Sequence, residues 1–153
     1  MPGTYSGGCL CGAIRYVISG EPLTLYACHC TDCQRRTGTG FALSLVVSRD
    51  SVEVRSGEPV PYSAKLADGR IKQGRMCAAC GTRLWAESVR SPQALIVQPG
   101  TLDDTSWLRP VAHIWTRSAQ PWFQFPKGVA LFETQPAKPW EELFKLWRER
   151  AAQ

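Results

Sequence analysis

The feature that most constrains this chain is a dense run of metal-binding residue types in its first quarter. The segment Cys28-His29-Cys30-Thr31-Asp32-Cys33 places three cysteines and one histidine within six residues. Thiolates are soft ligands, and Zn²⁺ binds four ligands in a tetrahedron with Zn–S distances of about 2.3 Å. Three protein ligands leave one coordination position open, as in zinc sites that perform chemistry. The segment therefore predicts a metal centre with a free position for a substrate.

The other four cysteines form a second set. Cys9 and Cys11 make a C-x-C pair, and Cys77 and Cys80 make a C-x-x-C pair followed by Gly81. Together they supply four sulfurs, which would close a zinc ion to substrate and join two distant segments of the chain. The binding energy of such an ion is folding energy. The seven cysteines thus predict one structural zinc and one open zinc site, and an open site can lose its ion and oxidise.

Composition restricts the class of protein. The chain has 153 residues, of which 44% are hydrophobic, so we expect one domain with a real core. Its 13 glycines and 11 prolines favour many short strands over long helices. We expect no membrane span and no signal peptide, because no long apolar run is present and residues 1–5 lack an apolar core. A cytoplasmic location follows as an expectation, and clustered cysteines there indicate metal binding rather than disulfides.

The net charge argues against a nucleic-acid partner. The formal charge is +5, but it counts every cysteine as neutral. Seven thiolates would subtract seven charges and two zinc ions would add four, which leaves +2. The basic residues are also scattered, with Arg35-Arg36 and Arg148–Arg150 as the dense spots.

Local patterns predict short strands around the cysteine clusters. The expected strands are residues 13–18, 23–28, 41–47, 51–55, 60–65, 70–76, 82–87, 94–97 and 111–115. A short helical turn should begin at Thr31 or Asp32 and end near Gly38, with its first N–H groups facing a thiolate.

The carboxyl end predicts a different element. Trp140, Leu143, Phe144 and Trp147 recur at the spacing of one helical face, and Pro139 precedes them at the expected helix start. This apolar stripe leaves two roles open, a cap on the same domain and a homodimer interface.

Five spaced blocks give the chain a family resemblance. They are Gly-Gly-Cys-Leu-Cys-Gly-Ala-Ile-Arg-Tyr, Cys-His-Cys-x-x-Cys-x-Arg-x-x-Gly, Cys-x-x-Cys-Gly-Thr, Gly-Thr-Leu-Asp-Asp and His-Ile-Trp, in this order. The pattern resembles the glutathione-dependent formaldehyde-activating enzyme family (Gfa-like, centromere protein V-type). The resemblance implies a mainly β chain with a β-tent (Mss4-like) fold of antiparallel sheets around zinc. We assign this zinc-binding domain to residues 1–133. Residues 134–153 are expected to form a linker and a short C-terminal amphipathic helix packed on the same domain, and this helix is not part of the family pattern.

The resemblance also implies ligands and an activity. Cys9, Cys11, Cys77 and Cys80 would hold the structural zinc, and Cys28, Cys30 and Cys33 the second, catalytic one. The family condenses formaldehyde with glutathione to S-hydroxymethylglutathione, a carbon–sulfur lyase reaction in the reverse sense. The expected partner is therefore a small thiol adduct of an aldehyde.

Four further residues are candidates for substrate binding. Arg35 and Arg36 could bind the carboxylates of a glutathione-like thiol, and the alternative is that both are solvated surface charges. His113 and Trp115 could line the site, and the alternative for each is packing in the core or the pocket wall.

Two alternatives compete with the catalytic interpretation. His29 as a fourth ligand would close the second site, but alternation along a strand turns it away from Cys28 and Cys30. A non-catalytic zinc scaffold that binds a protein or chromatin partner is the other hypothesis. It has no need of an unsaturated metal, so the three-cysteine cluster favours the enzyme.

Overall fold

The protein is described by a computed structural model of residues 3–150, in which most regular structure is β. The chain divides into two compact units. Unit 1 comprises the residues up to Pro22 together with Val46–Trp107, and unit 2 comprises Leu23–Leu45 together with the residues from Leu108 onward. Each unit contains one of the two cysteine clusters, and each is described by itself below.

Unit 1 is built from short strands and two 3₁₀ turns. Its elements are β1 (Thr4–Gly8), β2 (Arg15–Ser19), η1 (Arg49–Ser51), β5 (Val52–Ser56), β6 (Val60–Lys65), β7 (Ile71–Met76), β8 (Arg83–Glu87), β9 (Ala94–Val97) and η2 (Pro99–Thr101). β1, β2 and β5 form a three-stranded antiparallel sheet in that order. Tyr16 and Ile18 alternate inward along β2 and are almost completely buried, as the period of two in a strand requires.

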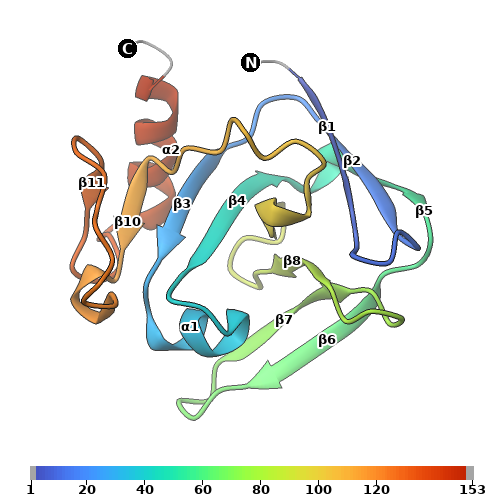
Figure 1. The fold of residues 1–153 in the computed structure, drawn as a ribbon, viewed down its shortest axis with the longest axis horizontal. Helices are drawn as coiled ribbons and strands as arrows, with labels where there is room; N and C mark the ends of the chain where they lie inside the picture. The colour runs from blue at the N-terminus through green and yellow to red at the C-terminus, as the bar shows by residue number, and fades with distance from the viewer. Residues whose placement is uncertain (1–2, 151–153) are drawn as a thin grey trace. The chain divides into compact units, whose positions relative to one another are not determined.

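Strands β6 to β9 follow one another as antiparallel neighbours, seen as the green and yellow strands of Figure 1. The pairing of β7 with β8 shifts register between Arg75 and Met76. An extra residue of this kind bends a strand locally. Arg75 lies opposite Trp85 and Met76 lies opposite Arg83, so the extra residue is Leu84 of β8 and the bend lies just after the C-x-x-C loop.

Unit 2 combines the middle of the chain with its carboxyl end. Its elements are β3 (Thr24–Cys28), α1 (Thr31–Thr37), β10 (Ala112–Ile114), η3 (Thr116–Ser118), β11 (Ala130–Leu131), α2 (Pro139–Arg150) and the first part of β4 (Ala42–Ser48), which continues into unit 1. The strands lie in the order β11-β10-β3-β4. β10 pairs with both β3 and β11 in parallel, with His113 opposite Ala27 and Ile114 opposite Cys28. The sequence predicted antiparallel sheets, and these two parallel pairings are a feature it did not reveal.

Helix α2 packs against β3, beside which it lies in Figure 1. Leu143 and Trp147 from the predicted stripe are buried, and Trp140 stacks on Phe144 with ring centroids 5.6 Å apart. Thr24 of β3 donates a buried hydrogen bond of 3.0 Å from Oγ1 to the carbonyl of Leu143. Part of the apolar stripe is therefore covered by the protein's own strand.

Helix α1 begins and ends where the sequence indicated. Gly38 adopts a left-handed conformation (φ 70°) and donates its N–H to the carbonyl of Gln34 at 2.8 Å, which ends the helix. No described helix has both the length and the apolar content needed to cross a bilayer.

Candidate metal centres

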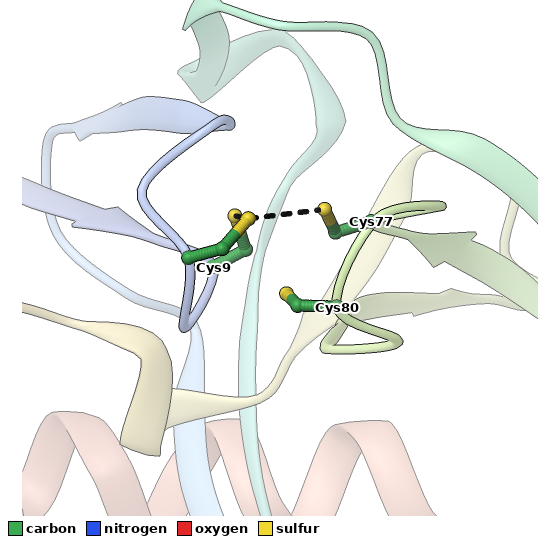
Figure 2. A group of neighbouring side chains, drawn as sticks. Cys9, Cys77 and Cys80 are labelled. Carbon is green, nitrogen blue, oxygen red and sulfur yellow. Dashed lines mark hydrogen bonds between the residues drawn. The ribbon is translucent and has the colours of Figure 1, made fainter.

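The four-cysteine site (Cys9, Cys11, Cys77 and Cys80) brings together two turns of unit 1. Figure 2 shows the sulfurs of Cys9, Cys77 and Cys80 facing one another from these turns. The Sγ atoms of Cys9 and Cys11 are 3.6 Å apart, and those of Cys11 and Cys77 are 3.8 Å apart. These distances are too long for a disulfide, in which the sulfurs are about 2.05 Å apart. All four sulfurs lie within 4.8 Å of one another, so one metal ion could bind them all.

Backbone hydrogen bonds shape both turns around the sulfurs. In the first turn, Ile14 donates its N–H to Cys9 Sγ at 3.2 Å, and Gly12 permits the reversal with a φ of 78°. In the second, Gly81 has a φ of 74° and donates to the carbonyl of Cys77 at 2.9 Å. Glycine adopts such angles without steric cost. The glycines that accompany the cysteines in the sequence therefore have a direct structural purpose.

Thr82 joins the two turns. Its Oγ1 accepts the backbone N–H of Leu10 at 3.1 Å and lies 3.1 Å from Cys80 Sγ. Hydrogen bonds from Thr82 lower the pKa of Cys80 to about 5. By contrast, the pKa of Cys11 rises to about 11, because its neighbours Cys9 and Cys80 outweigh a hydrogen bond from the backbone of Ala13. Crowded thiolates repel one another, and a divalent cation would offset that repulsion.

The three-cysteine site (Cys28, Cys30 and Cys33) is local in sequence. Cys28 ends β3, Cys30 is the N-cap of α1, and Cys33 lies in the first turn of that helix. The sulfur of Cys30 accepts the N–H of Cys33 at 3.3 Å, which confirms the predicted approach of a helix-start N–H to a thiolate. All three sulfurs lie within 4.8 Å of one another. They could hold an ion while leaving part of its coordination sphere to another molecule.

The same crowding affects the thiols of this site. Cys30 and Cys33, followed by burial, raise the pKa of Cys28 far above its usual range. A hydrogen bond to Cys28 lowers the pKa of Cys33, but Cys30 and burial outweigh it and the net shift is upward. Three crowded thiolates, of which Cys28 is buried and Cys30 and Cys33 are half-buried, would therefore be stabilised by a positive charge beside them, as a metal ion would supply.

One polar side chain of unit 2, Tyr26, lies close enough to this cluster to feel the charge of Cys28. Tyr26 precedes Cys28 by two residues on β3, so both side chains leave the strand on the same face. The phenol is 8% exposed and hydrogen-bonds to Ser44 of β4. Burial, and next the charge of Cys28, raise the pKa of Tyr26, whereas the positive charge of Arg36 acts in the opposite direction.

The predicted substrate-binding residues occupy different environments. Arg36 is partly buried and close enough to influence the charge of Cys33, whereas Arg35 is exposed on α1. Trp115 is partly buried, donates from Nε1 to Gln135 Oε1 at 3.3 Å and carries the guanidinium of Arg117 over its ring. Trp115 is also the only non-glycine residue with a positive φ (58°) among residues 3–150. His113 is 2% exposed and hydrogen-bonds to His29.

His29 does not join the three sulfurs. Its ring is completely buried and pairs with His113, and the group of side chains that could bind one ion contains the cysteines without it. Strand alternation had predicted this direction for the side chain.

Sequence reasoning missed Tyr26, Ser44 and the pairing of the two histidines. The position of Tyr26 was open to prediction, because it shares a strand face with Cys28. The contacts of Ser44 and His113 depend on which strands lie beside β3, and no local motif encodes that.

Comparison with known proteins gives the family. Residues 4–118, most of the chain, match the profile of the family described as glutathione-dependent formaldehyde-activating enzyme. The chain belongs to this family. The match includes all seven cysteines, so both clusters of this GFA-family protein lie within the family region.

One solved structure shows a related fold. It is a crystal structure of a Rhodobacter sphaeroides protein that was a structural genomics target, with a TM-score of 0.51 and 19% sequence identity. The alignment covers 83% of this chain and 98% of that one. With the strands, the two cysteine clusters and the C-terminal helix described above, it confirms the mainly β, Mss4-like fold that the sequence predicted.

Proposed function

We propose that this GFA-family protein is a zinc enzyme of the carbon–sulfur lyase type, acting on a thiol adduct of a small aldehyde such as S-hydroxymethylglutathione. The observation that carries the proposal is the three-cysteine site, because three convergent thiols can hold an ion without enclosing it. Family membership supports the choice of reaction.

The spacing of the sulfurs supports zinc as the metal. A tetrahedral ion with Zn–S bonds of about 2.3 Å has ligand atoms about 3.8 Å apart. The two separations in the four-cysteine site, 3.6 and 3.8 Å, fit this value. An all-thiolate ligand set also favours a soft or borderline metal over magnesium or calcium. We therefore assign Zn²⁺ to both sites, with a structural role in the first.

A bound zinc ion would supply a Lewis acid and would stabilise a thiolate at neutral pH. In the synthetic direction the thiol sulfur attacks the carbonyl carbon, a C–S bond forms, and the former carbonyl oxygen receives a proton. The lyase direction breaks the same bond and returns the proton to sulfur. In both directions negative charge appears on the oxygen, which a hydrogen-bond donor can stabilise.

Tyr26 is our candidate for that donor. Its phenol lies on the strand face of Cys28, and Ser44 holds it in a buried position. Arg36 is the candidate for binding a carboxylate of the thiol, because its positive charge already acts on Cys33 and Tyr26. Arg35, which is exposed on the same helix, would bind substrate less directly.

The test is an exchange measurement. ¹³C-formaldehyde and glutathione equilibrate without an enzyme, so the rate of exchange between free and adduct signals is followed by NMR with and without the protein. We expect acceleration by the metal-loaded protein and none by protein stripped with a chelator. Replacing glutathione with cysteine or 2-mercaptoethanol tests the choice of thiol. If the metal-loaded protein accelerates exchange with none of these thiols, the proposal is contradicted and the zinc scaffold is favoured.

A further inference from the structure

His29 occupies an unusual position, because it separates two cysteines of the three-cysteine site yet turns its own ring away from them. The ring is completely buried, and its Nε2 lies 2.9 Å from Nδ1 of His113. His113 comes from β10, whose parallel pairing with β3 places the two histidines side by side. One hydrogen bond therefore links the middle of the Cys-His-Cys sequence to a strand 84 residues away.

Three aromatic rings enclose this pair. The centroids of Phe41, Phe123 and Phe125 lie 5.2, 4.8 and 5.4 Å from that of His29. The outer nitrogens, Nδ1 of His29 and Nε2 of His113, have no hydrogen-bond partner among the described residues. Burying such groups costs about 1–3 kcal/mol each. Apolar rings would fill the same space without that cost, so packing alone does not explain the pair.

The backbone of His29 is held as firmly as its ring. Its N–H donates to the carbonyl of Ile114 at 3.0 Å, and its carbonyl accepts Nε2 of Gln34 at 2.8 Å. The same Gln34 amide donates to the carbonyl of Ser118 at 2.9 Å, and Gln120 donates to Gln34 Oε1 at 2.8 Å. Residue 29 thus has little freedom to rotate. Because Cys28 and Cys30 flank it directly, the directions of their side chains are fixed as well.

We propose that the His29–His113 hydrogen bond positions the three-cysteine site for metal binding. The bond restricts the conformation of residue 29, and this restriction keeps the sulfurs of Cys28 and Cys30 directed toward one another. His29 and His113 are positioning residues, not ligands and not substrate-binding residues. This inference rests on the proposed role of the three-cysteine site as a metal centre, and it gives His113 a function there that needs no contact with substrate.

The geometry allows a test in which each substitution keeps or loses one particular nitrogen. The side-chain amide of Asn places a polar atom near the Nδ1 position of His, and that of Gln places one near Nε2. His113 uses Nδ1 and His29 uses Nε2. H113N and H29Q should therefore keep the link, whereas H113Q and H29N should lose it.

Cobalt is the probe, because Co²⁺ bound to thiolates absorbs visible light and reports ligand geometry. The full-length protein and each variant are titrated with Co²⁺ against a competing chelator. We expect H113Q and H29N to bind the second ion about tenfold more weakly, which is the smaller loss typical when a residue that orients a metal ligand is replaced. The visible spectrum of the bound cobalt should also change. The four-cysteine site should bind as in the wild type. H113N and H29Q should remain within about twofold of the wild type.

A control separates positioning from general stability. T24V removes another buried hydrogen bond of unit 2, which Thr24 donates to Leu143, without a large change in volume. It should lower the free energy of unfolding yet leave the second cobalt affinity unchanged.

Three results would overturn the inference: equal cobalt affinities for the Asn and Gln variants, an effect of T24V as large as that of H113Q, or a wild-type protein that binds one ion in excess cobalt. If the wild-type protein is inactive but the Asn and Gln variants still differ in cobalt affinity, the proposed reaction is contradicted and the positioning role stands.

Discussion

The two cysteine sites of this protein differ in how far their cysteines lie apart in the chain. In the four-cysteine site, Cys11 and Cys77 are separated by 66 residues and the sulfurs come from two turns. In the three-cysteine site, all ligands fall within six residues at the junction of β3 and α1. A metal that joins distant segments stabilises the fold, whereas one bound by a single segment adds little to it.

The supporting contacts differ in the same way. Glycines, backbone hydrogen bonds and the hydroxyl of Thr82 shape the turns of the four-cysteine site. Buried side chains surround the three-cysteine site, with Tyr26 on one side and the His29–His113 pair on another. We therefore expect the three-cysteine site to be more sensitive to changes in neighbouring buried side chains than the four-cysteine site.

The largest expected effect is the loss of the four-cysteine site. C77S should remove one ligand of an ion whose binding contributes on the order of 10 kcal/mol to folding. We expect the variant to be largely unfolded or insoluble at 37 °C, as measured by circular dichroism and metal content. A C77S protein with the wild-type melting temperature would show that this site is not structural.

C33S is the matched change in the other site. It should lose the second ion and at least about 10³-fold in turnover, because a Lewis acid supplies several kcal/mol to such a reaction. Its melting temperature should stay within a few degrees of the wild type. If C33S unfolds as C77S does, the distinction between a structural and a catalytic site fails.

Y26F tests the proposed role of the Tyr26 phenol as a hydrogen-bond donor in the three-cysteine site. Removing the phenol oxygen should lower kcat about 10²-fold, as loss of a donor to a developing oxyanion does. Y16F is the control, because the buried hydroxyl of Tyr16 in unit 1 hydrogen-bonds to Thr101 Oγ1 at 2.6 Å. Y16F should lose about 1 kcal/mol of stability and no activity. Equal kinetic effects would remove Tyr26 from the mechanism.

Acid should weaken the part of unit 2 around His113. Burial, and next the neighbouring His29, lower the pKa of His113 to about 4, below its unfolded value of about 6.5. The unfolded chain therefore binds more protons between these values, so stability falls as the pH falls through this window. We expect the free energy of unfolding to fall by about 2 kcal/mol between pH 6.5 and 5. Hydrogen exchange of the amides in β3 and β10 would measure this loss. H113N has no titrating group at this position, so its stability should depend less on pH. An unchanged slope would show that His113 is not the cause of the pH dependence.

The smallest effect distinguishes two neighbours on α1. R36A should raise KM about tenfold through loss of a charge-assisted contact, whereas R35A should change it less than about twofold because Arg35 is exposed. Steady-state kinetics at constant ionic strength compares them. The reverse order would place the carboxylate of the substrate on the exposed side of the helix.

Much of this architecture was predictable from local patterns. The strands at 60–65 and 94–97 have the predicted bounds, and α2 begins at Pro139 as expected. Gly81 has the positive φ that its place after Cys80 implied. Each of these features depends on residues within one or two turns of the chain, which is why spacing and residue type were enough to predict them.

The sequence by itself determined which residues could bind metal: seven cysteines, their division into four and three, and the glycines that let the chain turn around them. The tertiary structure decided what supports the three-cysteine site. The parallel pairing of β10 with β3 places His113 beside His29, and the neighbouring β4 carries Ser44 to Tyr26. Such contacts depend on strand order and register across the sheet, and a change of one residue in register would direct these side chains to the opposite face.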